Sequence, residues 1–431
     1  MAFGTSATTA LLHGPALSPI DEWVYIDYLH KLPDQGPPRK GEPIGPEALE
    51  HMACFGVTPY GPMGAPCAGS YDDYSVFPFG GITSADAYTP LYFGVSIVVG
   101  EAFALLPGID QLDGWRISSA VWHSASIIAL VALLRYWRVP AGPTVAVSLL
   151  AIGSPYAYWT YSYVSTDAPS FLFGAALLLV ASRLIRGEVG FLLLVVLSVL
   201  ATLFKVTNLY AVGLAALVVL IHFLFSLKRR IPSEARWWRD PVLLRPLVGG
   251  MLASALALAA QALWLMWNRS TAVSELGAEQ GISIPLTSNE VLGQLANFLP
   301  GTIVSNVAIA GSTGYALPLP NFVTIPLSWM CVAGVVAALF LMKRDDETKP
   351  VIVAVAIASV TFAPALAIAF ESLMGSYFPL PPRYGAPILP GILLLAASIM
   401  RNRVGPSLVI PYGAALCVVM VIAAARLGSV V

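Results

Sequence analysis

The stretch that decides the fold covers residues 189–230 and reads VGFLLLVVLSVLATLFKVTNLYAVGLAALVVLIHFLFSLKRR. It contains two apolar runs, 189–206 and 208–227, and each is close to the ~20 residues that a helix needs to cross a bilayer. The basic triplet after the second run predicts a cytoplasmic end, because Lys and Arg concentrate in cytoplasmic loops. The stretch therefore predicts two transmembrane helices joined by a short turn on the outer side.

Runs of the same character recur along the chain of 431 residues. The others are 115–135, 142–160, 165–185, 247–267, 322–342, 350–372, 383–400 and 408–426. Only 11% of the residues are charged and 57% are hydrophobic, whereas a soluble domain carries about 25% charged residues. The N-terminal run 2–17 is short for a span, and we expect that part of a first helix is missing from it. The composition predicts an all-α polytopic membrane protein with one domain over 1–431 and about 11 transmembrane helices.

Basic residues orient these spans. Every second connection is basic, with Lys and Arg at 135–138, 183–186, 228–245, 343–349 and 401–403. The opposite connections, 161–164, 268–321 and 373–382, hold few basic residues, and the long loop 18–90 is expected to share this outer side. If the loop 18–90 and these connections all lie on the outer side, the segment 91–107 cannot cross the membrane. We therefore predict an interfacial or re-entrant helix at 91–107. The alternative is an ordinary span there, with the charge rule broken at Arg135 and Arg138.

The net charge bears on the kind of partner, and the cysteines bear on packing and cross-linking. The net charge of -1 gives no indication of a nucleic-acid partner. Cys331 and Cys417 lie in apolar segments and are expected to be packing residues. Cys54 and Cys67 share the loop 18–90, where a disulfide between them and two free thiols both fit the sequence.

Two adjacent carboxylates mark the start of the first outer loop. Asp21 and Glu22 directly follow the first apolar run, and ionisable residues at a membrane boundary are costly and indicate function. The residues that follow predict an amphipathic helix, on which Asp27 and His30 share a face and the aromatic residues Trp23, Tyr25 and Tyr28 suit the membrane interface. A polar helix end with an aromatic belt is the alternative. The pair is suited to act as a general base on a lipid-linked substrate.

Further candidates lie on the same outer side. Asp167 ends an aromatic turn whose rings, Tyr163 among them, suit either a sugar site or an interfacial belt. Asp167 is also placed to cap the helix that follows it. Basic side chains suited to bind a phosphate are Lys205, Arg383 (followed by Tyr384), Arg269 and Arg116.

Metal and nucleotide motifs are weak or missing. Asp72 and Asp73 could bind a divalent cation through their oxygens, although two Asp residues in a loop more often form a turn. We find no HExxH, no phosphate-binding glycine loop and no dinucleotide fingerprint.

Several short motifs follow one another in a set order. They are Asp21–Glu22 after the first helix, Thr-Pro-Leu-Tyr-Phe at 89–93, Arg-Ile-Ser-Ser at 116–119, the turn ending in Asp167, and Pro-Arg-Tyr at 382–384. Their order resembles that of the GT-C superfamily, integral membrane glycosyltransferases that use polyprenyl-phosphate sugars. The bacterial aminoarabinose and mannosyl transferases and the actinobacterial arabinosyl enzymes are similar. The likeness covers most of the chain in layout and only these motifs in residues.

The resemblance implies a role for each candidate. Asp21 matches the catalytic carboxylate, Glu22 is the reserve, and Asp167 matches the second outer acidic position. Lys205 and Arg383 would hold the lipid phosphate, with Tyr384, Arg269, His30 and Tyr163 as further substrate-binding residues. The chain departs from the pattern in its short first helix and in ending after the last span, so a smaller glycan or lipid-linked acceptor is expected.

The activity implied is inverting transfer of a hexosyl or pentosyl group from a polyprenyl-phosphate donor to a cell-envelope glycan or lipid-linked acceptor. The site would face the extracytoplasmic side of the inner (plasma) membrane, among membrane lipids, and a divalent cation stays open. A transporter or flippase of a lipid-linked sugar is the competing class, because it too carries charges among many helices. A non-catalytic assembly subunit is the third.

Overall fold

The computed structural model describes residues 1–58, 60–230, 241–274, 284–305, 319, 321–342, 348–374, 377, 379–400 and 402–427. Within these ranges six helices are long and apolar enough to cross a membrane. They are α5 (Gln111–Tyr136), α10 (Leu209–Arg230), α11 (Pro241–Ser270), α13 (Asn321–Leu341), α14 (Thr348–Met374) and α16 (Val404–Leu427). The prediction of an all-helical polytopic membrane protein is confirmed.

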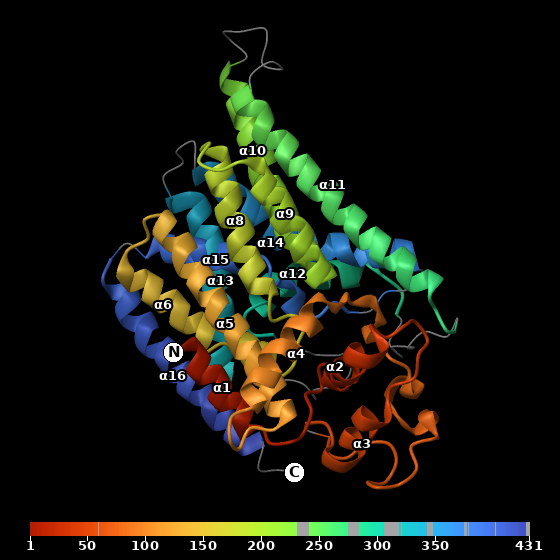
Figure 1. Cartoon of the computed structure of the whole chain (residues 1–431). Coiled ribbons are helices and arrows are strands. Elements are labelled where there is room, and N and C mark those ends of the chain that lie inside the picture. Colours follow the sequence, from red (N-terminus) through yellow and green to blue (C-terminus); the bar gives the residue numbers. More distant parts are fainter. Residues whose placement is uncertain are drawn as a thin grey trace.

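Shorter apolar helices complete the bundle. They are α4 (Pro90–Ala104), α6 (Ala141–Ile152), α8 (Ser170–Ile185), α9 (Phe191–Phe204) and α15 (Leu389–Ile399). In Figure 1, α1 (Ala2–Leu12) lies against α5 and α16, while α9, α10 and α11 pack side by side in another part of the bundle. The expected helix at 91–107 is α4, and its 15 residues span about 22 Å, less than the ~30 Å of a bilayer core. Its interfacial or re-entrant placement stays a prediction.

Two predicted segments have more local structure than the sequence predicts. The run 142–160 is two helices, α6 and α7 (Pro155–Tyr161), because Ser154 accepts a capping hydrogen bond from Ala157 N and Pro155 starts a new helix. At the break, Gly153 lets α16 approach so closely that a Cβ would lie 2.6 Å from Cys417 N. The segment 268–321, predicted as an outer loop, contains α12 (Ser288–Gly301). The predicted basic positions at 236, 239, 343, 344 and 401 lie outside the described residues.

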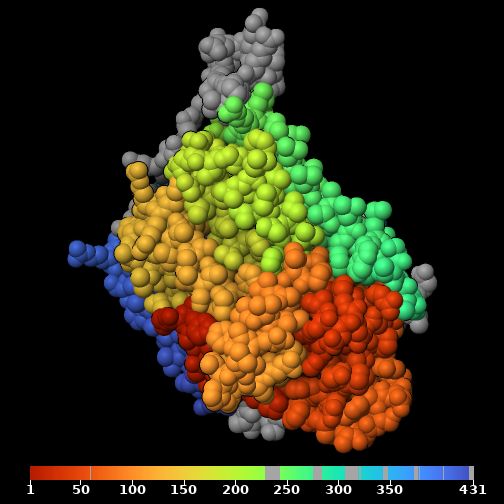
Figure 2. Space-filling model, viewed as in Figure 1, coloured from red at the N-terminus to blue at the C-terminus, as the bar shows by residue number. Residues whose placement is uncertain are grey.

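The segment 18–90, predicted as the first outer loop, folds as a compact cap over one end of the helices. It contains α2 (Glu22–Gln35), α3 (Pro46–Phe55) and the short helices η1 (Tyr74–Val76), η2 (Pro78–Gly81) and η3 (Ala85–Ala87). Figure 2 shows this cap, in red and orange, beside the green end of α11. Two hydrogen bonds join them: Trp264 Nε1 donates to Ala87 O at 2.9 Å and Asn268 Nδ2 donates to Asp86 Oδ2 at 3.0 Å.

The aromatic residues of α2 pack in the buried interior of the cap and do not form an interfacial belt. Trp23, Tyr25 and Tyr28 are all buried, and the ring of Tyr28 stacks on that of Phe93 with centroids 3.7 Å apart. The belt was expected because aromatic rings are common at membrane surfaces. The cap covers these rings, so α2 is a packed helix inside the cap.

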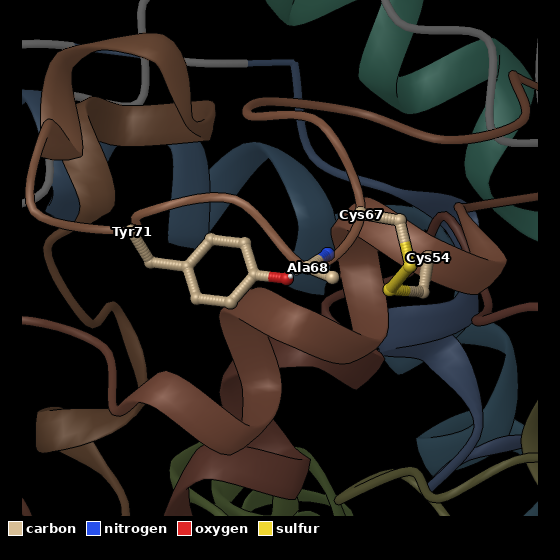
Figure 3. Close-up of a disulfide and its surroundings, with 4 residues drawn as sticks. All are labelled: Cys54, Cys67, Ala68 and Tyr71. Atoms are coloured by element: carbon tan, nitrogen blue, oxygen red, sulfur yellow. Dashed lines mark hydrogen bonds between the residues drawn. A yellow bond between two sulfur atoms is a disulfide. The ribbon is translucent and has the colours of Figure 1, made fainter.

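A disulfide between Cys54 and Cys67 closes the far side of the cap. It fixes the end of α3, and near it Tyr71 Oη accepts a hydrogen bond from Ala68 N at 3.0 Å (Figure 3). Directly after α3, Leu17 N donates to Gly56 O at 3.0 Å and Thr58 N donates to Leu17 O at 2.8 Å. The disulfide therefore stands beside the backbone that holds the segment leading to Asp21.

We expect the double variant Cys54→Ser/Cys67→Ser to unfold more easily than the native protein. The disulfide closes a loop with a sequence separation of 13, and such a cross-link stabilises by about 2–4 kcal/mol, chiefly by restricting the unfolded chain. Thermal unfolding in detergent, followed by intrinsic fluorescence, measures the effect. Reductant should lower the Tm of the native protein and leave that of the double variant unchanged; equal responses of the two would contradict the prediction.

Candidate functional site

Four charged side chains from distant parts of the sequence meet where the cap joins the bundle. They are Asp21, Asp167, Lys205 and Arg383, named here the charge cluster. Lys205 Nζ lies 2.6 Å from Asp167 Oδ1, and Arg383 Nε lies 3.2 Å from Asp167 Oδ2. Arg383 Nη2 is also 3.7 Å from Asp21 Oδ2. The structure thus brings together four residues that the sequence proposed separately.

Exposure differs sharply among the four side chains. Asp167 and Lys205 are each 3% exposed and Arg383 is 9% exposed, whereas Asp21 is 35% exposed. Buried ions are tolerated only when they are paired, and Asp167 satisfies both cations at once. Asp21 is the member of the cluster that an incoming molecule reaches.

Asp167 is held by a tight turn that precedes α8. Its backbone N donates to Ser165 Oγ at 3.2 Å, and its carbonyl accepts from Ser170 N at 3.0 Å. The N-cap of α8 is Pro169, and no side chain caps this helix. The alternative role of Asp167 as a helix cap is therefore wrong, because its carboxylate is turned toward Lys205 and Arg383.

Lys205 and Arg383 both lie in short segments at helix ends, and both side chains contact Asp167. Lys205 is extended (φ -162°, ψ 134°) between α9 and η4 (Val206–Asn208), and Asn208 Nδ2 closes this break by donating to Ala201 O at 2.8 Å. Arg383 lies in η6 (Pro382–Gly385). A Cβ on Gly385 would lie 2.4 Å from Thr302 Oγ1, so η6 is pressed against the end of α12.

Asp21 is set at the N-terminus of α2 in a left-handed conformation, φ 58° and ψ 12°. Asp is one of the few residue types that tolerate this region. Burial within the cap raises the pKa of the Asp21 carboxyl, and the neighbouring Arg383 and Lys205 lower it in part. A carboxylate with a raised pKa is better matched to proton transfer near neutral pH.

Three tyrosine rings surround the charge cluster. Lys205 Nζ lies 5.7 Å from the ring centroid of Tyr88 and 5.5 Å from that of Tyr384, which are cation–π distances. Tyr25 packs edge-on against Tyr88 at 5.8 Å, and its Oη accepts from Thr166 Oγ1 at 3.2 Å. Apolar ring faces beside paired charges are suited to hold the C–H face of a sugar.

Sequence reasoning missed Tyr88 and the place of Tyr25 in the site. Tyr88 comes immediately before Thr89, which caps α4 and also donates to the carbonyl of Leu203 near the end of α9. Because Thr89 is bonded to the end of α9, the neighbouring Tyr88 lies beside Lys205. The helix-start signal Thr89-Pro90 was readable in the sequence, but its contact with α9 was not.

The remaining candidates lie elsewhere. Glu22 and Tyr163 both contact Arg116, in a second buried network. His30 packs edge-on against Trp115 at 5.0 Å, and burial lowers its pKa. Arg269 is exposed at the end of α11. None of these side chains has a contact with the charge cluster among the hydrogen bonds and ion pairs of the described residues.

The acidic pair of the first loop is exposed. Asp72 accepts a hydrogen bond from Ser70, and Asp73 accepts from Ser75 as in an ordinary turn. In the part of the chain that the structure describes, no three His, Cys, Asp or Glu side chains gather as a metal site would require. The pair stays a weak candidate for a divalent cation.

Chemically, the charge cluster combines an accessible carboxylate with two buried cations. The carboxylate can remove a proton from a hydroxyl group. The cations can stabilise negative charge that develops on a leaving phosphate. Both functions act on the same small volume, because Arg383 contacts both carboxylates.

Comparison with known proteins gives a structural likeness. No protein-family model and no curated protein matches the chain. Among solved structures, the chain is similar to the crystal structure of ArnT from Cupriavidus metallidurans in the apo state, with 14% sequence identity and a TM-score of 0.49. The match covers 98% of this chain and 75% of that chain. A likeness of this strength does not assign the chain to a family.

Proposed function

We propose that this chain is an integral membrane glycosyltransferase of the GT-C type. It transfers a hexosyl or pentosyl group from a polyprenyl-phosphate donor to a glycan or lipid-linked acceptor on the extracytoplasmic side of the inner membrane. One observation carries the proposal: the accessible Asp21 carboxylate lies 3.7 Å from Arg383, which shares Asp167 with Lys205. The motif order that resembles the GT-C superfamily supports the same conclusion.

In the proposed reaction, Asp21 takes the proton of an acceptor hydroxyl. The hydroxyl oxygen forms a bond to the anomeric carbon while the bond from that carbon to the phosphate oxygen breaks, so the configuration inverts. The electron pair leaves with the polyprenyl phosphate, whose charge Lys205 and Arg383 stabilise. General base catalysis contributes typically 10²–10⁴-fold, and buried, preorganised charges contribute strongly because little reorganisation is needed.

Asp167 has a positioning role in this proposal. Its carboxylate holds the two cations together before the donor binds, so that they are desolvated and fixed in place. Tyr88, Tyr384 and Tyr25 would contact the sugar. A prenyl tail would lie among the apolar helices, which explains why a sugar-transfer site is built at the edge of a membrane bundle.

The proposal is tested in proteoliposomes that contain the purified protein, radiolabelled polyprenyl-phosphate sugars and cell-envelope extract as acceptor. We expect transfer from the lipid-linked donor and none from nucleotide sugars. Movement of the donor across the bilayer without transfer would replace the proposal with a flippase. Neither transfer nor movement with any donor would reject both.

In the same assay, Lys205→Gln is expected to lower kcat/KM for the donor by about 10- to 100-fold, since a hydrogen bond to a charged group contributes about 1.5–3 kcal/mol. The effect should include a fall in kcat, because Lys205 stabilises the charge that develops on the leaving phosphate. Lys228→Gln is the matched control, because Lys228 is exposed near the opposite end of α10. Equal kinetics of Lys205→Gln and the control would remove Lys205 from the donor site.

A further inference from the structure

A second ion pair, Glu22 with Arg116, lies beside the charge cluster and contacts no substrate-accessible space. Both side chains are 0% exposed. Arg116 Nε donates to Glu22 Oε1 and Arg116 Nη2 donates to Glu22 Oε2, each at 2.9 Å, in a bidentate arrangement. Such paired hydrogen bonds fix orientation as well as distance.

The pair also binds backbone from two further parts of the chain. Glu22 accepts from Ser18 N at 2.7 Å and from Val164 N at 2.9 Å. Arg116, in α5, donates to the carbonyls of Gly14 at 2.6 Å and Ala16 at 2.7 Å. One ion pair therefore joins the segment before α2, the first turns of α5, and the turn that leads to Asp167.

These contacts leave Glu22 no capacity to act as a base. Each carboxylate oxygen already accepts two hydrogen bonds, and neither is exposed. Glu22 is the immediate neighbour of Asp21, and Val164 stands three residues before Asp167. The two carboxylates of the charge cluster are thus both held, through short backbone connections, by Glu22.

The conformation of Asp21 requires such support. A left-handed backbone at a non-glycine residue costs about 1–2 kcal/mol and persists where the surroundings hold it. The turn 18–22 is closed by the Ser18 N bond to Glu22 and by Ile20 N donating to Ser18 Oγ at 3.0 Å. Without the carboxylate of Glu22, this turn would lose the bond that spans it.

We propose that the Glu22–Arg116 pair positions Asp21 against Arg383 within the charge cluster. The expected effect of this pair on kcat rests on the proposed function, whereas its effect on the position of Asp21 does not. Stability alone is a poor reason for the pair, since desolvating two charges costs several kcal/mol and apolar replacements of buried pairs are often as stable. The pair is a positioning device, and neither residue touches the reacting atoms.

The first test measures the position of residue 21 without any transfer assay. In an Asp21→Cys background, the rate of labelling by a membrane-impermeant thiol reagent reports access to that position. Cys54 and Cys67 are bonded, and Cys331 and Cys417 are buried. We expect Glu22→Gln/Arg116→Gln to change the rate severalfold. The control Asp27→Asn/Lys31→Gln removes the other buried ion pair of α2 and should leave it unchanged.

The second test separates positioning from stability. In an otherwise native chain, Glu22→Gln/Arg116→Gln leaves no unpaired charge, so its Tm should fall less than that of either single substitution, while kcat falls about 10²-fold, the effect of a misplaced reacting group. The KM for the donor should change little, because Lys205 and Arg383 are untouched. Arg116→Lys, which keeps the charge and loses the bidentate contact, serves if the double variant does not fold, and should show the same split to a lesser degree.

The outcomes are distinguishable. Unchanged thiol labelling at position 21 together with native kcat overturns the positioning role. A loss of kcat that only follows the loss of folded protein overturns it as well. If the native protein transfers no sugar, the proposed function fails, while the labelling experiment still decides whether the pair positions residue 21.

Discussion

Asp21→Asn is expected to lower kcat by about 10²–10⁴-fold, the usual contribution of a general base. Asparagine is nearly isosteric and cannot accept the proton, so donor binding by Lys205 and Arg383 should persist. The measurement is initial-rate kinetics with the lipid-linked donor, together with a binding assay for that donor. A native KM with a collapsed kcat is the expected combination.

Asp34→Asn is the matched control, because Asp34 is an exposed carboxylate on the same helix, α2. It should retain native kinetics. Full activity in Asp21→Asn would transfer the role of base to Asp167, the other carboxylate of the charge cluster.

The pH dependence of the native protein gives a second view of the same group. Burial raises the pKa of Asp21, and Arg383 and Lys205 offset part of the shift. The base works only when deprotonated, so kcat/KM should rise with pH through this raised pKa. The acid limb should therefore lie above the ordinary range of an aspartate carboxyl, and an acid limb at that ordinary range would contradict the assignment.

Asp167→Asn is expected to be the most damaging single change for stability. It leaves Lys205 and Arg383 buried without the carboxylate that both contact, and removing one partner of a buried ion pair costs about 3–5 kcal/mol. Unfolding in detergent, by heat or by denaturant, measures the loss. Activity should fall as well, because the two cations lose the group that holds them together.

A second variant identifies the cause of that loss. Asp167→Asn/Lys205→Met removes one of the two cations that lose the Asp167 carboxylate. It should recover part of the lost Tm without recovering activity. If the double variant is less stable than Asp167→Asn, charge burial is not the source of the effect. An unchanged Tm in Asp167→Asn itself would show that the cations find other partners.

The sequence predicted the helices that depend on local hydropathy. The run 322–342, for example, is α13, because about twenty apolar residues have few other structures in a membrane. The sequence-based prediction missed the break between α6 and α7 at Ser154-Pro155, where local chemistry interrupts an apolar run. The N-cap and proline signals were present there, but the overall hydropathy of the run outweighed them.

The charge cluster was predicted one residue at a time. Asp21, Asp167, Lys205 and Arg383 each stood out because a charge at the outer end of an apolar run is unusual. Their mutual distances depend on packing between segments far apart in the chain, which no local pattern encodes. For the same reason the sequence suggests a phosphate ligand at Arg116, although the partner of Arg116 is Glu22, 94 residues away.

The order of synthesis has a consequence for when this site becomes complete. Asp167 and Lys205 are 38 residues apart, whereas Asp167 and Arg383 are 216 apart. A growing chain therefore acquires the second cation only when nearly all of its helices have been made. Until then only Lys205 can pair with Asp167, so the charge cluster is completed late in synthesis.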